Sequence, residues 1–73
     1  MKYEDFICEL WDAVRACPRE WRKGQSVFNV IEEMWGVARA VQWEDGVDCF
    51  YNDDYIQEFI DKSWERIKEV YGY

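Results

Sequence analysis

The sequence contains no histidine and no threonine among its 73 residues, and its only proline is Pro18. Without histidine, the chain lacks the usual general base near neutral pH and the commonest zinc ligand. Its two serines, Ser26 and Ser63, lie outside any Gly-x-Ser-x-Gly motif, so a serine nucleophile is not indicated either. The sequence therefore argues against an enzyme, and we expect no catalytic residue, no cofactor and no metal ion.

Long apolar runs and paired cysteines are also missing. The three cysteines, Cys8, Cys17 and Cys49, are an odd number without a Cys-x-x-Cys pair, which favours reduced thiols in the cytoplasm. The longest uncharged stretch, residues 24–31, is far shorter than the ~20 apolar residues that cross a bilayer. No basic N-terminus leads into an apolar segment, so no signal peptide is predicted.

Aromatic and acidic residues are abundant instead. Hydrophobic residues make up 49% of the chain and aromatic residues 19%, which excludes a disordered acidic tail and indicates one folded domain over residues 1–73. The formal net charge is −7, and it is unevenly distributed. Residues 1–41 carry six basic and seven acidic side chains, whereas residues 42–73 carry three basic and nine acidic ones.

The first half of the chain shows apolar residues at helical spacing. This pattern predicts a helix over residues 3–16, which Pro18 ends because the residue before a proline avoids the α-helical conformation. One further helical turn is expected over residues 19–23. A second helix is predicted over residues 25–34, followed by a break at Gly36 and a short third helix over residues 37–41.

Helical periodicity is lost over residues 42–54. Residues 44–46 are typical of a turn, and residues 47–51 are expected to be extended or irregular. Asn52, Asp53 or Asp54 is then predicted to cap a final helix, with Asp54 and Gln57 at the spacing of a capping box. The expected fold is all-α, a small bundle of three to four helices with an irregular acidic loop before the last helix.

Two charged clusters suggest binding sites and are better explained structurally. The acidic loop is rich in calcium-type ligands, but its spacing does not match a calcium-binding loop, so its acids are interpreted as turn and cap residues. A basic cluster surrounds Trp21. For this cluster we expect intramolecular pairing, with the acidic loop or with Asp12 and Glu20, rather than nucleic-acid binding. Its members are Arg15, Arg19, Arg22 and Lys23.

Two short motifs in the middle of the chain resemble a known pattern. The first reads Arg22-Lys23-Gly24-Gln25-Ser26-Val27-Phe28-Asn29, and the second reads Asp48-Cys49-Phe50-Tyr51-Asn52-Asp53. Together they resemble small uncharacterised bacterial and phage proteins with an R-x-G-Q-x-x-F-N motif and a later D-P-F-Y-x-D motif. This sequence differs in having Cys49 at the proline position. The resemblance covers residues 22–60 and implies a small helical domain without an established activity.

These motifs also suggest how the loop is held. Gln25 and Asn29 lie one turn apart on one side of a helix, so their amides are predicted to bond the backbone of residues 48–51. Gly24 would permit a close approach, and Phe50 and Tyr51 would sit on the docked loop. On this interpretation Phe28, Phe50 and Phe59 share the core, and the change Asn29→Ala lowers the melting temperature. A polar patch that faces a partner is the alternative interpretation.

Tryptophan positions favour a protein-binding function. Trp21 and Trp43 lie outside the apolar stripes, so they are expected either to contact a partner protein or to cover the edge of the core. The sequence therefore predicts a small protein–protein interaction domain, for which a phage or mobile-element origin is one interpretation and homodimerisation is one use of such a surface. The alternative is an acidic inhibitor or nucleic-acid mimic that docks on a basic surface through Asp45, Asp48 and Asp53.

Overall fold

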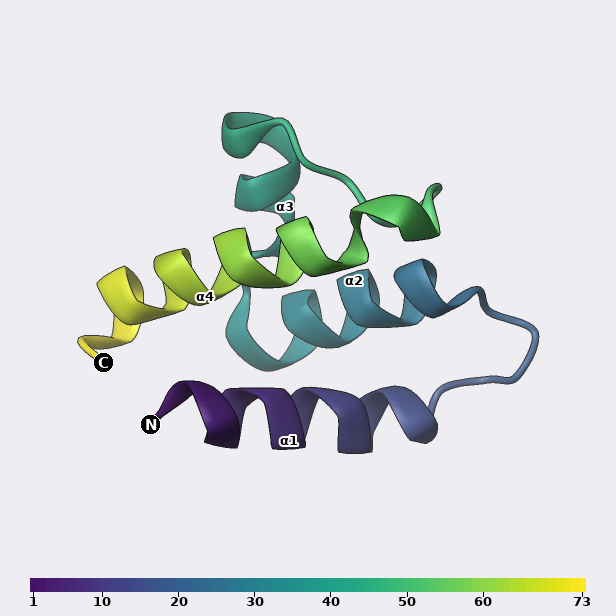
Figure 1. Ribbon diagram of the computed structural model, residues 1–73, viewed down its shortest axis with the longest axis horizontal. Coiled ribbons are helices and arrows are strands. Elements are labelled where there is room, and N and C mark those ends of the chain that lie inside the picture. The colour runs from purple at the N-terminus through teal and green to yellow at the C-terminus, as the bar shows by residue number, and fades with distance from the viewer.

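The apolar stripes fold into an all-α structure, seen here in a computed structural model of residues 1–73. The elements in chain order are α1 (Tyr3–Arg15), α2 (Lys23–Trp35), α3 (Ala38–Ala40), the π-helical turn η1 (Val41–Asp45), the 3₁₀ turn η2 (Asp53–Tyr55) and α4 (Ile56–Tyr71). α1 and α2 are antiparallel neighbours, α4 lies against α2 and runs in the same direction, and both termini are at one end (Figure 1). None of the helices has the length and apolar character needed to cross a bilayer.

The ends of α1 and α2 follow local sequence signals. In the first turn of α1, the Asp5 carboxylate accepts a hydrogen bond from the Lys2 backbone N–H at 3.2 Å. After α1 the chain makes a turn in which the Trp21 N–H donates to the Pro18 carbonyl at 3.2 Å. This turn spans residues 18–21 and is not helical, so the predicted helical turn over residues 19–23 is wrong. The next helix, α2, begins at Lys23. The predicted break is confirmed, because Gly36 ends α2 with a φ of 72°.

The segment after α3 differs from the prediction. Helical structure was expected to end near residue 41, but it continues through η1 to Asp45. A distant residue contacts this segment: the Arg66 guanidinium on α4 lies 3.0 Å from the Asp45 carboxylate and 3.0 Å from that of Glu44. Apolar spacing carries no trace of this contact, which joins positions 21 residues apart.

The start of α4 also needs a correction. Among the three cap candidates, Asn52 caps the preceding 3₁₀ turn η2, because its Oδ1 accepts the Asp54 backbone N–H at 2.9 Å. The N-cap residue of α4 itself is Tyr55, whose side chain makes no capping hydrogen bond. The capping box of Asp54 and Gln57 does not form, because the Gln57 amide donates instead to Asp61 at 3.0 Å, one turn further along the helix. The capping box was therefore wrong, although the helix it introduced is present.

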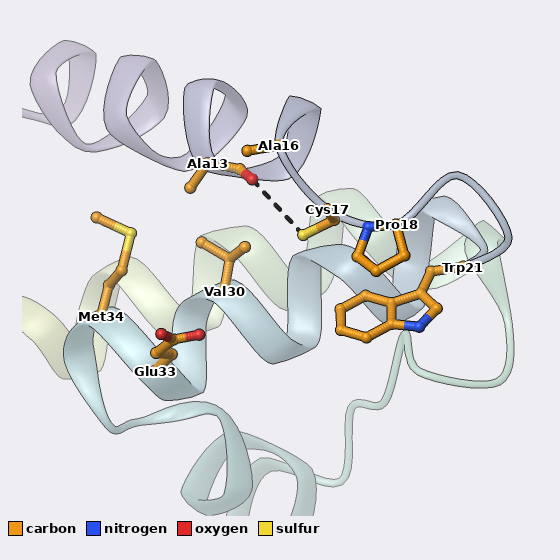
Figure 2. A pocket seen from close by; sticks show the side chains of 8 residues that line it. All are labelled: Ala13, Ala16, Cys17, Pro18, Trp21, Val30, Glu33 and Met34. Atoms are coloured by element: carbon orange, nitrogen blue, oxygen red, sulfur yellow. Dashed lines mark hydrogen bonds between the residues drawn. The ribbon is translucent and has the colours of Figure 1, made fainter.

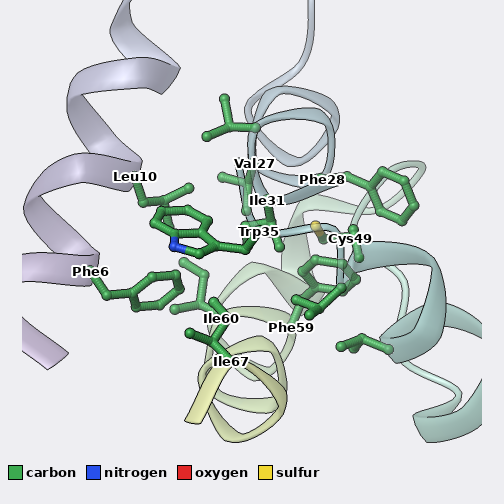
Figure 3. Packing of buried hydrophobic residues seen from close by; sticks show 14 of the residues in the cluster. Phe6, Leu10, Val27, Phe28, Ile31, Trp35, Cys49, Phe59, Ile60 and Ile67 are labelled. Carbon is green, nitrogen blue, oxygen red and sulfur yellow. The ribbon is translucent and has the colours of Figure 1, made fainter. Parts of the chain in front are cut away.

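One hydrophobic core joins all the helices (Figure 3). At one end Phe6 packs between Trp35 and Trp64, with ring centroids 4.9 and 5.2 Å away. At the other end the predicted sharing of the core by three phenylalanines is confirmed, since Phe28 lies 5.5 Å from Phe50 and 5.4 Å from Phe59. The fully buried side chains are Phe6, Leu10, Val27, Ile31, Ala38, Val41, Cys49, Phe59, Ile60, Ser63 and Ile67.

The buried hydroxyl of Ser63 provides a test of this core. Its Oγ has no hydrogen-bond partner, and leaving a buried polar group unpaired costs about 1–3 kcal/mol. We expect Ser63→Ala to raise the free energy of unfolding by about 1 kcal/mol, which chemical denaturation measures. The control Lys62→Ala, at an exposed neighbour on the same helix, should change it by less than about 0.5 kcal/mol. A destabilised Ser63→Ala variant would contradict this account of the hydroxyl.

Candidate functional site

An apolar groove lies between the C-terminal half of α1 and the middle of α2 (Figure 2). It is open to solvent and has a volume of about 410 Å³. Six of its eight lining residues are apolar, and Glu33 is the only charged one. The lining residues are Ala13, Ala16, Cys17, Pro18, Trp21, Val30, Glu33 and Met34.

The groove exists because side chains on its α1 side are small. Ala13 and Ala16 lie three residues apart, so both project from the same face of the helix toward α2. Opposite them, Val30 and Met34 lie one helical turn apart on α2 and form an apolar floor. Met34 remains 42% exposed although it belongs to the apolar stripe of its helix. The groove therefore leaves an apolar side chain open to solvent beside two alanines.

The two tryptophans singled out in the sequence have different environments. Trp21 is half-buried and closes one end of the groove, with its indole near Pro18 (Figure 2). Trp43 lies on η1 and is 82% exposed, so it does not cover the core edge. The structure therefore does not bring the two together: Trp21 belongs to the groove, and Trp43 projects from the acidic half of the chain.

The three acids predicted to contact a partner all have partners within the chain. Asp45 accepts two hydrogen bonds from Arg66, which lower the pKa of its carboxyl. Asp48 accepts from the Gln42 amide at 3.1 Å and from the Phe50 backbone N–H at 2.8 Å. Asp53 accepts the Gly24 backbone N–H at 3.0 Å. These carboxylates hold the loop in place.

The acidic loop docks on the N-terminus of α2 through an arrangement we call the loop junction, formed by Arg22, Gly24, Cys49, Phe50 and Asp53. The Arg22 side chain, at the N-cap of α2, accepts no hydrogen bond from the free backbone N–H groups of the first turn. Asp53, 29 residues after Gly24, supplies the missing acceptor for the Gly24 N–H. The Cys49 thiol donates to the Gly24 carbonyl at 3.3 Å, and the Arg22 guanidinium donates to the Phe50 carbonyl. Asp53 therefore acts as the N-cap acceptor of α2, where a negative charge is favourable.

The predicted amide pins are not part of this junction. Neither the Gln25 nor the Asn29 side chain donates or accepts a hydrogen bond with residues 48–51, because the helix backbone at Gly24 already occupies that position. Tyr51 is likewise outside it, 76% exposed with its ring against Phe50. The pinning role of Gln25 and Asn29 was wrong, and the expected loss of stability in Asn29→Ala loses its basis.

Cys49 is fully buried, and burial raises the pKa of its thiol from 9.0 to about 12. Above pH 9 the unfolded chain releases this proton while the folded chain retains it, so unfolding is favoured as pH rises toward 12. We expect the free energy of unfolding to fall over this interval by up to about 1.4 kcal/mol per pH unit more than in Cys49→Ala. Parallel denaturation series across that pH range measure the difference. Equal slopes in both proteins would contradict a protonated buried thiol.

The basic cluster is only partly paired as predicted. Arg15 forms an ion pair with Asp12 at 2.6 Å, which confirms one of the expected partners. Arg22 bonds a backbone carbonyl of the acidic loop, and the Lys23 ammonium lies 5.0 Å from the centre of the Trp11 ring. Glu20 forms no ion pair. Two of the four basic side chains, Arg22 and Lys23, thus link the segment between α1 and α2 to the acidic loop and to α1.

Comparison with protein-family models, curated proteins and solved structures finds no match. The resemblance to small bacterial and phage proteins stays a prediction. No group of three or more histidine, cysteine, aspartate or glutamate side chains is placed to hold a metal ion.

Sequence reasoning missed most of the groove. Only Trp21 was singled out, because Val30 and Met34 fit the apolar stripe of their helix and the alanines have no distinctive chemistry. The pair of small residues Ala13 and Ala16, at the edge of the stripe of α1, is the one signal that pointed to it.

A second, more polar hollow of about 320 Å³ lies beside Tyr55, between the loop and α4.

Proposed function

We propose that the chain is a non-enzymatic protein-binding domain whose docking site is the groove between α1 and α2. The observation that carries this is the open apolar groove itself, with Trp21 at one end and exposed Met34 at the other. Aromatic and methionine side chains in partly desolvated hollows contribute strongly to protein interfaces. The domain would work in the cytoplasm, because the Cys49 thiol is used as a reduced hydrogen-bond donor in the core.

Filling the groove tests this function. Ala16 is exposed just after α1, so Ala16→Phe occupies the groove without disturbing the core. We expect a partner captured by the immobilised wild-type protein, then purified and titrated, to bind Ala16→Phe at least about tenfold more weakly. The control Glu69→Phe adds the same ring to an exposed position of α4, which contributes nothing to the groove, and should leave the affinity unchanged. Equal affinities for all three proteins would reject the groove as the docking site.

A second candidate function is supported by Trp43. It projects from the half of the chain that carries nine acidic and three basic side chains, and such a surface attracts basic proteins. On this proposal the chain acts as an acidic inhibitor that docks on a basic surface. Binding that is lost between low and moderate salt and depends on Trp43 supports it, whereas salt-insensitive binding that depends on Trp21 supports the groove.

A further inference from the structure

Trp43 is the one tryptophan of the chain that the fold leaves uncovered. It is 82% exposed and lies on η1, a π-helical turn, which is a rare backbone form found often at functional sites. Contacts on both sides hold this turn in place, because Arg66 binds the Asp45 carboxylate at 3.0 Å and Gln42 donates to Asp48 at 3.1 Å. A large apolar ring is therefore presented to solvent on a fixed support.

The groove between α1 and α2 has opposite charge at its two ends. Glu33 and Met34 lie at one end, and Pro18 and Trp21 lie at the other (Figure 2). Glu33 forms no ion pair within the chain. At the Trp21 end, residues 12–23 carry four basic and two acidic side chains, which makes that end net positive. Neither sign dominates the groove, so charge favours an occupant that carries both signs.

The charges beside Trp43 are also of opposite sign on its two sides. Arg39 lies four residues before it, one helical turn away, and is exposed without an ion-pair partner. Glu44 and Asp45 follow it, and their two carboxylates share a single arginine, Arg66. The ring of Trp43 therefore has a positive side and a net negative side.

The groove and Trp43 lie on different sides of the molecule. In Figure 1, α1 is on one side of α2, whereas α3 and the turn that follows it are on the other. A chain therefore cannot place Trp43 in its own groove, but two chains can make this contact head to tail.

Resting on the proposed protein-binding function, we infer that the occupant of the groove is a second copy of this chain, which inserts Trp43. The indole ring would cover Val30 and Met34 beside the two alanines of α1. The groove volume of about 410 Å³ is large enough for one such ring. Each apolar surface that one chain leaves in water is thus buried by the other.

Charge sets the direction in which Trp43 enters. One orientation brings Arg39 to Glu33 and brings Glu44 to Arg19, an exposed residue of the segment between α1 and α2. The reverse orientation puts like charges together at both ends, which weakens binding. The contact joins the acidic half of one chain to the nearly neutral residues 1–41 of the next. The general repulsion between two chains of charge −7 is screened over about 8 Å at physiological salt.

This contact does not close into a symmetric pair. Because the ring and the groove are different surfaces, each added chain leaves one groove and one Trp43 free for the next chain. The two surfaces can therefore be removed separately.

Two variants that each lose one half of the contact test the inference. Trp43→Ala retains the groove and lacks the ring, whereas Ala16→Phe retains the ring and has a filled groove. In sedimentation at concentrations up to about 1 mM, where weak contacts are measurable, we expect the wild-type mass to rise with concentration. Each variant alone should stay a monomer. An equimolar mixture of the two variants should form a heterodimer and grow no further.

Charge variants of this heterodimer test the orientation. Glu33→Lys, added to the Trp43→Ala protein, should weaken the heterodimer at least about fivefold, although it lowers the net negative charge. Arg39→Glu, added to the Ala16→Phe protein, should then restore most of the affinity. The control Glu69→Lys makes the same change in net charge on α4 of the Trp43→Ala protein and should not weaken the heterodimer.

Three results would overturn the inference. They are a wild-type chain that stays a monomer at every concentration, a variant that associates alone as strongly as wild type, and an equimolar mixture of the variants that does not associate. Equal affinities with Glu33→Lys and Glu69→Lys would overturn the orientation.

The two proposals fail differently. If the chain does not self-associate while a captured partner is still lost in Ala16→Phe, the groove binds another protein and only the occupant is wrong. If that partner binds wild type and Ala16→Phe equally, the groove is not a docking site, and both proposals are rejected together.

Discussion

Replacing Gly24 by alanine is expected to lower the free energy of unfolding by about 2–3 kcal/mol, the upper range for forcing an atom into a packed site. A Cβ at this position would lie 2.7 Å from the Asp53 carboxylate oxygen and closer still to the Cys49 carbonyl. The carbonyl belongs to the backbone and cannot turn away, so the loop must leave α2. Thermal unfolding should show a melting temperature lower by about 8–20 °C.

The sign of this change separates two explanations of the glycine. Helix propensity alone predicts that Gly24→Ala stabilises α2, by up to about 1 kcal/mol. Gln25→Ala, at the next residue in the same helical turn, is the control and should alter the free energy of unfolding by less than about 0.5 kcal/mol. A stabilised Gly24→Ala variant would show that the loop junction does not hold the loop against the helix.

The Phe6→Ala variant should lose about 3–5 kcal/mol of stability, the usual cost of deleting a buried phenylalanine ring. Phe6 is fully buried between Trp35 and Trp64, and it joins α1 to both α2 and α4. A chain of 73 residues has a total stability of only about 4–11 kcal/mol. Circular dichroism should therefore show a melting temperature lower by at least about 15 °C, or a chain unfolded at room temperature.

Two comparison variants make this prediction specific. Phe6→Leu keeps an apolar side chain in the site and should recover a large part of the lost stability. Trp43→Ala removes a larger ring from a position that is 82% exposed, and it should change the free energy of unfolding by less than about 0.5 kcal/mol. A Phe6→Ala loss no greater than that of Trp43→Ala would contradict the assignment of Phe6 to the core.

Stability and binding can be measured independently in this protein because two of the residues that line the groove lie outside the packed core. Ala16 and Glu33 are exposed, whereas Phe6 and Gly24 are buried. Changes at Ala16 or Glu33 are expected to alter binding while the melting temperature stays that of the wild-type protein. Changes at the second pair act on the fold itself, so a binding defect measured there carries no information about the groove.

Local patterns in the sequence were enough to predict the helices. Apolar spacing located all the main helical segments, Pro18 marked the end of α1, and the break at Gly36 is present with the positive φ that glycine adopts readily. These features depend on residues within one or two turns of each other. Such short-range preferences are readable from a single chain because no distant partner is needed to satisfy them.

The loop and the groove could not be predicted in the same way. Arg66 pairs with Asp45 of η1 from 21 residues away, and Asp53 caps α2 from 29 residues away. The sequence predicted these acids to be turn and cap residues or, in the alternative, contacts to a basic partner, and neither interpretation identified Arg66 or the N-terminus of α2 as their partners. The groove needs two helices side by side, so neither the alanines of α1 nor Met34 of α2 showed it alone.

The sequence by itself determined that this protein is an acidic, aromatic-rich, all-α chain with its negative charge concentrated after residue 41. Composition and periodicity are properties of neighbouring residues, and folding does not alter them. Only the tertiary structure decided which groups pair with the acids of the loop, that Asp53 caps α2 at Gly24, and that Trp21 closes a groove while Trp43 projects into solvent. Those outcomes depend on which distant surfaces meet, and that follows from packing all the helices around one core.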